Sequence, residues 1–156
     1  MGMKLAIIKW LKSTPRRSFV LYPVCVIEFE WLRLGQLNIV IWGAPLLAWG
    51  YLQYRFVGNY RTAIGGGGPG FQKPPEQIVD VGPYRFTRNP MYLGHLIFML
   101  GLVITYQSWL AVVILIGNIF WFHQRVLEDE QALALKFGDA YLSYKSKVKR
   151  WLPGLI

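Results

Sequence analysis

Four apolar segments dominate this chain and limit the folds that it can adopt. They span Ser18–Leu32, Leu37–Phe56, Met91–Tyr106 and Trp109–Phe122. With 54% hydrophobic residues, 16% aromatic residues and a mean hydropathy of +0.31, the 156-residue chain is too apolar for an ordinary soluble domain. A bilayer favours helices, because a helix pairs its backbone groups internally. We therefore expect a single all-α integral membrane domain with about four transmembrane helices.

The four segments differ in how strongly their sequences predict a membrane span. The first is the weakest, because a proline and two glutamates interrupt it and an ionised carboxylate is costly at bilayer depth. It crosses as a short or tilted helix, or it ends near Glu28. The second is a stronger span of about twenty residues. Only Gln107 and Ser108 separate the third segment from the fourth, which predicts a tight helical hairpin over residues 91–124.

Lysine and arginine gather in alternate connections between the apolar segments. They precede the first segment (Lys4, Lys9, Lys12, Arg16, Arg17), lie at the end of the second or after it (Arg55, Arg61, Lys73, Arg85, Arg88) and follow the fourth (Arg125, Lys136, Lys145, Lys147, Lys149, Arg150). The hairpin turn carries no charge, and Arg33 alone follows the first segment. By the positive-inside rule, both termini, a loop over residues 57–90 and a tail over residues 125–156 lie on the cytoplasmic side. If the first segment does not cross, the loop and the tail still share a side.

The same distribution weighs against other classes of protein. A net charge of +9 suits a nucleic-acid binder only where a soluble fold gathers it on one face, so we expect the lipid bilayer as partner and no nucleic acid. Residues 1–17 are basic and mildly amphipathic, which predicts an interfacial helix rather than a cleaved signal peptide. The lone Cys25 excludes an internal disulfide, and we expect no metal site.

A polar, basic loop turns directly into the third apolar segment at residues 82–94. Proline disfavours helix in the residue before it, while Asn89 followed by Pro90 is typical of an N-cap and a first helical residue. The positive N-terminal end of this helix then faces a loop rich in aromatic and cationic side chains, where it can hold a polar ligand. A plain helix cap flanked by interfacial arginines and tyrosines explains the residue types equally well.

The glycine run at residues 65–70 formally matches a dinucleotide-binding pattern through Gly65, Gly67 and Gly70. We reject this match, because Pro69 and the prolines that follow preclude the helix that the pattern requires. A flexible or ligand-covering loop is the better interpretation. Beyond it, residues 78–81 form a short extended run.

The tail has a helical apolar period. Leu133, Phe137, Tyr141, Tyr144 and Val148 recur at spacings of three and four, which predicts one or two amphipathic helices, with Gly138–Asp139 ending one and capping the next. Their apolar face packs either on the lipid interface or on the loop. Arg125 and Asp129 lie four residues apart, where they can pair on one face of a helix.

Several of these features occur in a fixed order. Gly82-Pro83-Tyr84, Arg88-Asn89-Pro90-Met91-Tyr92-Leu93-Gly94, the hairpin, Arg125-Val126, Asp129-Glu130, Leu133, Phe137-Gly138, Tyr141, Tyr144, Val148, Arg150 and Pro153 follow one another. This order resembles the isoprenylcysteine carboxyl methyltransferase family and its phospholipid methyltransferase relatives. The resemblance covers about half of the chain. It implies an integral membrane enzyme that transfers a methyl group from S-adenosylmethionine to a lipophilic or small acceptor at the cytosolic interface.

Carried over by position, the resemblance also implies roles for individual residues. The cofactor is held by Glu76, Gln77, Ile78, Val79, Tyr84, Arg88, Asn89, Pro90, Met91, Tyr92, Asp129 and Glu130. Arg125 binds the substrate, and Arg125 and Glu130 are the candidate catalytic residues. Two positions depart from the family pattern, which has histidine where this chain has Asn89 and a glutamate where it has Asp129. Asparagine does not titrate, so the acceptor (carboxylate, amine or thiol) stays open.

Two other readings of the sequence stay open. Membrane sterol reductases, which use a nicotinamide cofactor, look similar near their C-terminal ends but are much longer. A non-catalytic membrane scaffold or small transporter explains the apolar segments without a cofactor. Within the third segment, His95 is either a base or a polar packing residue.

Overall fold

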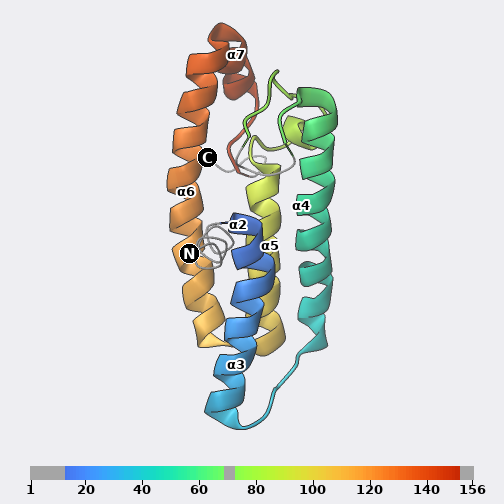
Figure 1. Ribbon diagram of the computed structural model, residues 1–156, viewed down its shortest axis with the longest axis vertical. Helices are drawn as coiled ribbons and strands as arrows, with labels where there is room; N and C mark the ends of the chain where they lie inside the picture. The colour runs from blue at the N-terminus through green and yellow to red at the C-terminus, as the bar shows by residue number, and fades with distance from the viewer. Residues whose placement is uncertain (1–12, 69–72, 152–156) are drawn as a thin grey trace, which may run out of the picture. The chain divides into compact units, whose positions relative to one another are not determined.

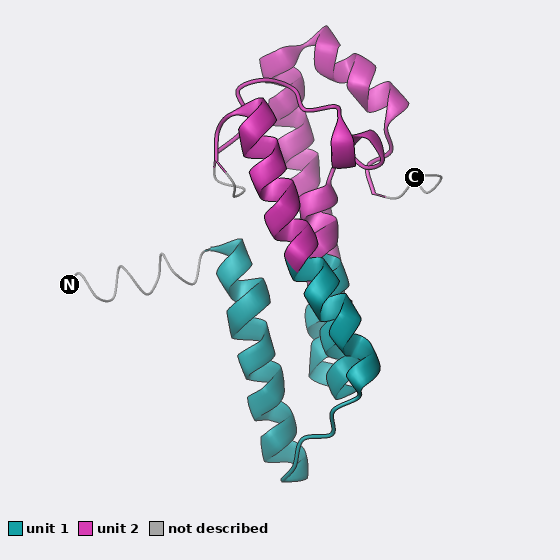
Figure 2. Cartoon of the chain, turned by 90° about the vertical axis from the view of Figure 1, so that its right-hand side faces the viewer, with its two compact units in different colours: residues 1–51, 95–117 teal, residues 52–94, 118–156 magenta. Residues whose placement is uncertain are grey.

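A computed structural model describes residues 13–68 and 73–151, and throughout these ranges the chain contains helices, turns and loops and no strand (Figure 1). Most of the expected interfacial segment, residues 1–12, lies outside the described residues. The chain divides into two compact units, residues 1–51 with 95–117 and residues 52–94 with 118–156 (Figure 2). The all-α prediction is therefore confirmed for the described part.

The first apolar segment is helical beyond its expected end. A short helix α2 (Thr14–Arg16), a π-helical turn η1 (Arg17–Leu21) and α3 (Tyr22–Leu34) follow one another. The helix itself does not end near Glu28, while the end of a membrane crossing in this segment stays a prediction. One further acid, Glu30, is buried, and its Oε2 lies 2.6 Å from Arg33 Nη2, so an ion pair offsets the charge within the helix. The helix stops at Gly35, whose φ of 68° is left-handed.

The second segment forms a helix, but its bounds differ from the prediction. Residues 37–40 are not helical, and α4 (Ala44–Gly65) begins after a 3₁₀ turn, η2 (Ile41–Gly43). The helix then continues to Gly65, so the expected loop over residues 57–90 is wrong for its first nine residues. The reason is local, since no strong helix breaker occurs before Gly66 and Gly67, whose φ values are 71° and 77°.

The predicted hairpin is confirmed. Helix α5 (Pro90–Tyr106) starts at the expected proline, and Gln107 and Ser108 join it to α6 (Trp109–Phe137). The predicted end of the hairpin near residue 124 is wrong, because α6 is a single helix of 29 residues that meets no breaker before Gly138. Gly138, with φ 54°, separates α6 from α7 (Asp139–Lys147), as its sequence predicts.

One described helix, α6, is both long and apolar enough to cross a membrane. Helix α5 is apolar but has only 17 residues. Four transmembrane helices are therefore not confirmed.

Small residues allow close helix packing within the first unit. A Cβ atom added to Gly101 would lie 2.8 Å from the backbone nitrogen of Leu47, so α4 and α5 touch there without side chains between them. Val26, Leu102 and Ala111 form a buried cluster in this unit.

His95 is fully buried, and its ring stacks on the Phe19 ring with centroids 4.6 Å apart. These contacts agree with the alternative in which His95 is a packing residue.

Candidate functional site

The second unit contains a cavity of about 320 Å³. It is lined by Arg61, Pro74, Pro75, Ile78, Val79, Tyr84, Arg88, Asn89, Met91, Tyr92, Asp129, Glu130, Ala132, Leu133, Lys136, Phe137 and Tyr141. These residues come from the end of α4, the loop that follows it, the start of α5, the polar half of α6 and α7. The volume lies at the low end of the range for small-molecule pockets, which is about 300–1,000 Å³.

The structure brings most of the expected site residues together around this cavity. Nine of the cofactor-binding candidates line it, namely Ile78, Val79, Tyr84, Arg88, Asn89, Met91, Tyr92, Asp129 and Glu130. Glu76, Gln77, Pro90 and Arg125 are not among the lining residues. Gln77 instead donates from Nε2 to the Ile64 carbonyl (2.7 Å), and the Pro90 carbonyl accepts from Gln53 (2.9 Å).

Three polar side chains meet at one side of the cavity. The Tyr92 hydroxyl donates to Asp129 Oδ2 at 2.7 Å, and Arg125 Nε lies 3.6 Å from Asp129 Oδ1, as their spacing of four predicts. Arg125 also lies 3.4 Å from Glu128 and exposes 44% of its side chain. Burial raises the pKa of Asp129, although the hydrogen bond from Tyr92 and the charge of Arg125 oppose the shift. Asp129 is thus a partly buried carboxyl group whose Oδ1 lies close to the Arg125 guanidinium.

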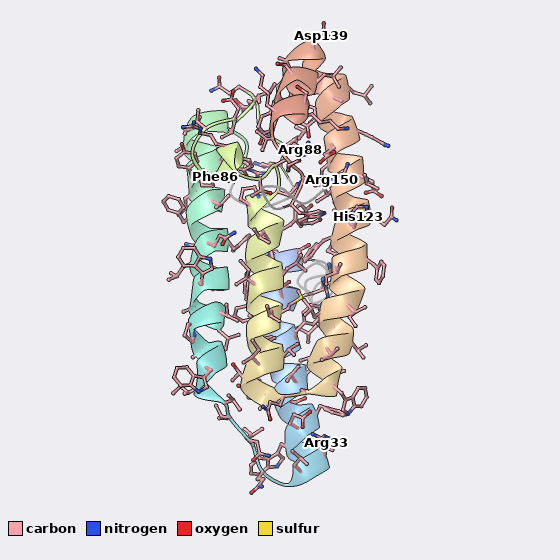
Figure 3. All side chains as sticks on the ribbon, turned by 180° about the vertical axis from the view of Figure 1, so that it is seen from behind. Arg33, Phe86, Arg88, His123, Asp139 and Arg150 are labelled. Carbon is pink, nitrogen blue, oxygen red and sulfur yellow. The ribbon has the colours of Figure 1, made fainter. Side chains whose placement is uncertain are left out.

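The neighbouring acid, Glu130, has different surroundings. Its side chain is buried and accepts hydrogen bonds from two arginines, Arg88 (2.9 Å) and Arg150 (3.0 Å). Figure 3 labels both arginines; Arg88 precedes α5 and Arg150 follows α7. Burial raises the pKa of Glu130, but the hydrogen bonds from Arg150 and Arg88 outweigh it, so the net pKa is lowered. Glu130 is therefore held ionised.

The stretch before α5 binds residues 145–150 of the tail. Arg88 Nη1 donates to the carbonyls of Lys145 (2.8 Å) and Val148 (2.7 Å). Thr87 Oγ1 and Asn89 Nδ2 both donate to the Arg150 carbonyl, at 2.9 and 3.2 Å. Asn89 accordingly uses its side-chain amide to hold the tail, while its backbone carbonyl accepts from Leu93 in the first turn of α5.

Buried tyrosines join the tail to the turn before α5. The hydroxyl of Tyr144 donates to the Tyr84 carbonyl at 2.8 Å, across 60 residues of sequence. Tyr84 lies in the 3₁₀ turn η3 (Gly82–Arg85), and burial raises the pKa of its phenol to about 12, so it stays neutral. Of the two packing alternatives for the tail, the contact with the loop is therefore the one found.

The sequence carries no signal for the residues that fix the loop. Lys136 Nζ donates to the Pro75 carbonyl (2.8 Å), and Arg61 donates to the carbonyls of Lys73 (3.2 Å) and Gly68. No sequence pattern links Arg61 or the prolines to the site. Leu133, Phe137 and Tyr141, by contrast, had a signal, since the apolar period of the tail already placed them on one face.

Over the described residues the fold is all-helical, and its second unit contains a cavity of small-molecule size. Residues 38–140 match the phospholipid methyltransferase family, and the chain belongs to that family. The resemblance drawn from the sequence is thereby confirmed.

Individual relatives agree with this assignment. Protein-S-isoprenylcysteine O-methyltransferase of Schizosaccharomyces pombe is 32% identical over 78 residues, 49% of this chain and 33% of the relative. The Xenopus laevis protein of the same name is 32% identical over 77 residues, 49% and 27% respectively. An uncharacterized protein of Haemophilus influenzae is 40% identical over 65 residues, 40% of this chain and its own whole length. The match thus spans a third or less of the two methyltransferases.

Proposed function

We propose that this protein transfers a methyl group from S-adenosylmethionine to a lipophilic or small acceptor at the membrane–cytosol interface. The observation that carries the proposal is the cavity of the second unit, because it gathers nine candidate cofactor residues from segments up to about fifty residues apart. Membership of the phospholipid methyltransferase family and the names of the relatives support the reaction type.

The cavity walls fit the chemical parts of this cofactor. Val79, Met91, Phe137 and other apolar or aromatic side chains form a surface on which a flat base can pack. Asp129 can accept hydrogen bonds from hydroxyl or ammonium groups, since its oxygens are not saturated by Tyr92 and Arg125. When bound, S-adenosylmethionine supplies an electrophilic methyl group on a sulfonium, and an aromatic face such as that of Tyr92 attracts such a cation.

In this reaction the protein aligns the acceptor with the cofactor and excludes water. In-line transfer needs the acceptor atom opposite the departing sulfur, so the geometry of the walls is decisive. Arg125 lies beside Asp129 and outside the cavity lining, where its half-exposed guanidinium can orient a polar acceptor group. An amine or thiol acceptor also loses a proton, whereas a carboxylate does not.

We further propose that the chain crosses the membrane four times with the cavity toward the cytosol. Large apolar side chains are exposed on α3 (Val24, Trp31, Leu32, Leu34), α4 (Trp49, Leu52, Phe56) and α6 (Val113, Ile116, Phe120). Soluble monomers rarely expose so many, and lipid contact explains them. The lysine and arginine distribution supports the orientation, since the loop and the tail that build the cavity carry most of the basic residues.

Calorimetry and a transfer assay test the proposal on the full chain purified in detergent. We expect S-adenosylmethionine to bind, and labelled methyl groups to reach a compound in a panel of total lipid, thiols, amines and carboxylates. Arg125→Met should reduce transfer strongly, whereas the matched control Arg55→Met, an exposed arginine on α4 outside the cavity lining, should not. Binding of a nicotinamide cofactor in place of S-adenosylmethionine would refute methyl transfer and favour a reductase.

A further inference from the structure

Two arginines take up most of the acceptor capacity of Glu130. Its Oε1 accepts from Arg88 Nε (3.1 Å), Arg88 Nη2 (2.9 Å) and Arg150 Nε (3.0 Å). Its Oε2 accepts from Arg150 Nη2 (3.1 Å) and lies 3.6 Å from Lys145 Nζ. A carboxylate offers about two acceptor sites on each oxygen, so Oε1 is fully occupied and Oε2 is engaged by Arg150 and close to Lys145. Glu130 therefore differs from Asp129, although both line the cavity.

The arginines bound to Glu130 tie the tail to the start of α5. Arg88 binds the carbonyls of Lys145 and Val148 in addition to Glu130, and its backbone nitrogen donates to the Lys149 carbonyl (3.0 Å). Arg150 reaches Glu130 through its side chain, while its carbonyl accepts from Thr87. Charge-assisted hydrogen bonds of this kind are stronger than neutral ones and fix geometry. Residues 145–150 are thus held at several points by groups on α6 and before α5.

The same part of the tail supplies a wall of the cavity. Tyr141 lines it and is buried, and Tyr144, one turn later, is bonded to the Tyr84 carbonyl. A helix of nine residues is marginal in isolation, so α7 depends on tertiary contacts for its formation and position. The position of this wall therefore depends on the anchoring of the residues that follow α7.

We propose that Arg88, Glu130 and Arg150 form a tail latch, which seats residues 139–150 against the cavity and thereby sets the affinity for the cofactor. Arg150 is a positioning residue that acts through Tyr141, and it takes no part in methyl transfer. Glu130 and Arg88 likewise position the tail, in place of the direct cofactor contact that the family resemblance implies for them. The identity of the ligand in this proposal rests on the proposed function, whereas the seating of the tail is independent of that function.

Three variants of the full chain test the latch: Arg150→Met, Arg150→Lys and the control Lys147→Met, which removes an exposed cation from the same tail. Hydrogen exchange of residues 139–150 is measured without cofactor, and S-adenosylmethionine affinity and steady-state kinetics are measured in parallel. We expect Arg150→Met to speed exchange in the tail and to raise the cofactor Kd and KM at least tenfold, with kcat at saturating cofactor changed less than twofold. Arg150→Lys should recover part of the loss, and Lys147→Met should match the wild type.

Each alternative result would overturn part of this scheme. Unchanged exchange in Arg150→Met would refute the latch, and faster exchange with an unchanged Kd would refute its link to the cavity. A fall in kcat with an unchanged KM would make Arg150 a participant in the chemistry. Absence of S-adenosylmethionine binding by the wild type would refute the proposed function, whereas the exchange comparison would still decide whether the latch exists.

Discussion

Replacing Glu130 by glutamine should destabilise the protein far more than replacing its neighbour Asp129 by asparagine. Glu130 and Arg88 expose 4% and 8% of their side chains and Arg150 exposes 19%, so the substitution leaves two mostly buried arginines without their shared carboxylate. Removing one partner of a buried ion pair costs about 3–5 kcal/mol, and the partial exposure of Arg150 favours the lower end, about 3 kcal/mol. For a chain of this size, that loss corresponds to a fall of about 6–12 °C in the unfolding midpoint.

The comparison with Asp129→Asn isolates the role of the charge. Because the pKa of Asp129 is raised, its ionised form costs stability above that pKa, and asparagine removes the cost while keeping an oxygen that accepts from Tyr92. We expect an equal or higher midpoint for Asp129→Asn at pH 8, measured by thermal unfolding of the detergent-purified variants. Similar losses in both variants, or no loss in Glu130→Gln, would contradict the different surroundings that we describe for the two acids.

Three further outcomes follow from the contacts. The folded pKa of Glu130 is lowered, so the stabilisation from its ionised carboxylate is complete above the ordinary glutamate pKa of about 4.3 and is lost as the pH falls through the folded pKa. The difference in unfolding midpoint between wild type and Glu130→Gln should therefore stay constant from pH 8 to 6 and shrink only below about pH 4.5. Gly101→Ala should cost about 1–3 kcal/mol in unfolding experiments, because its methyl group meets the backbone of α4, whereas Gly117→Ala, with no atom within 4 Å of the added carbon, should be neutral or stabilising. Tyr92→Phe should raise the Kd for S-adenosylmethionine about tenfold in calorimetry, since Asp129 loses the hydroxyl that orients it; an unchanged Kd would place Asp129 outside the binding site.

Local rules in the sequence predicted the helices well and their ends less well. Asn89–Pro90 marked the start of α5, Gln107–Ser108 the hairpin turn, and Gly138 the break between α6 and α7. These signals act within one or two turns of backbone and need no partner. The predicted ends of α4 and α6 are wrong because the apolar segments stop at residues 56 and 122, whereas the backbone stays helical until glycine interrupts it.

The sequence also determined the family and most of the cavity residues, because both follow from the order and spacing of residue types along the chain. Only the tertiary structure decided what each one contacts. Asp129 and Glu130 are adjacent and chemically alike, yet the helical turn directs one toward Tyr92 and Arg125 and the other toward Arg88 and Arg150. Contacts across 20 to 60 residues depend on how the loop and the tail fold over α6, and no local pattern records them. Arginines that resembled interfacial anchors in the sequence are, for this physical reason, the groups that hold the tail on the cavity.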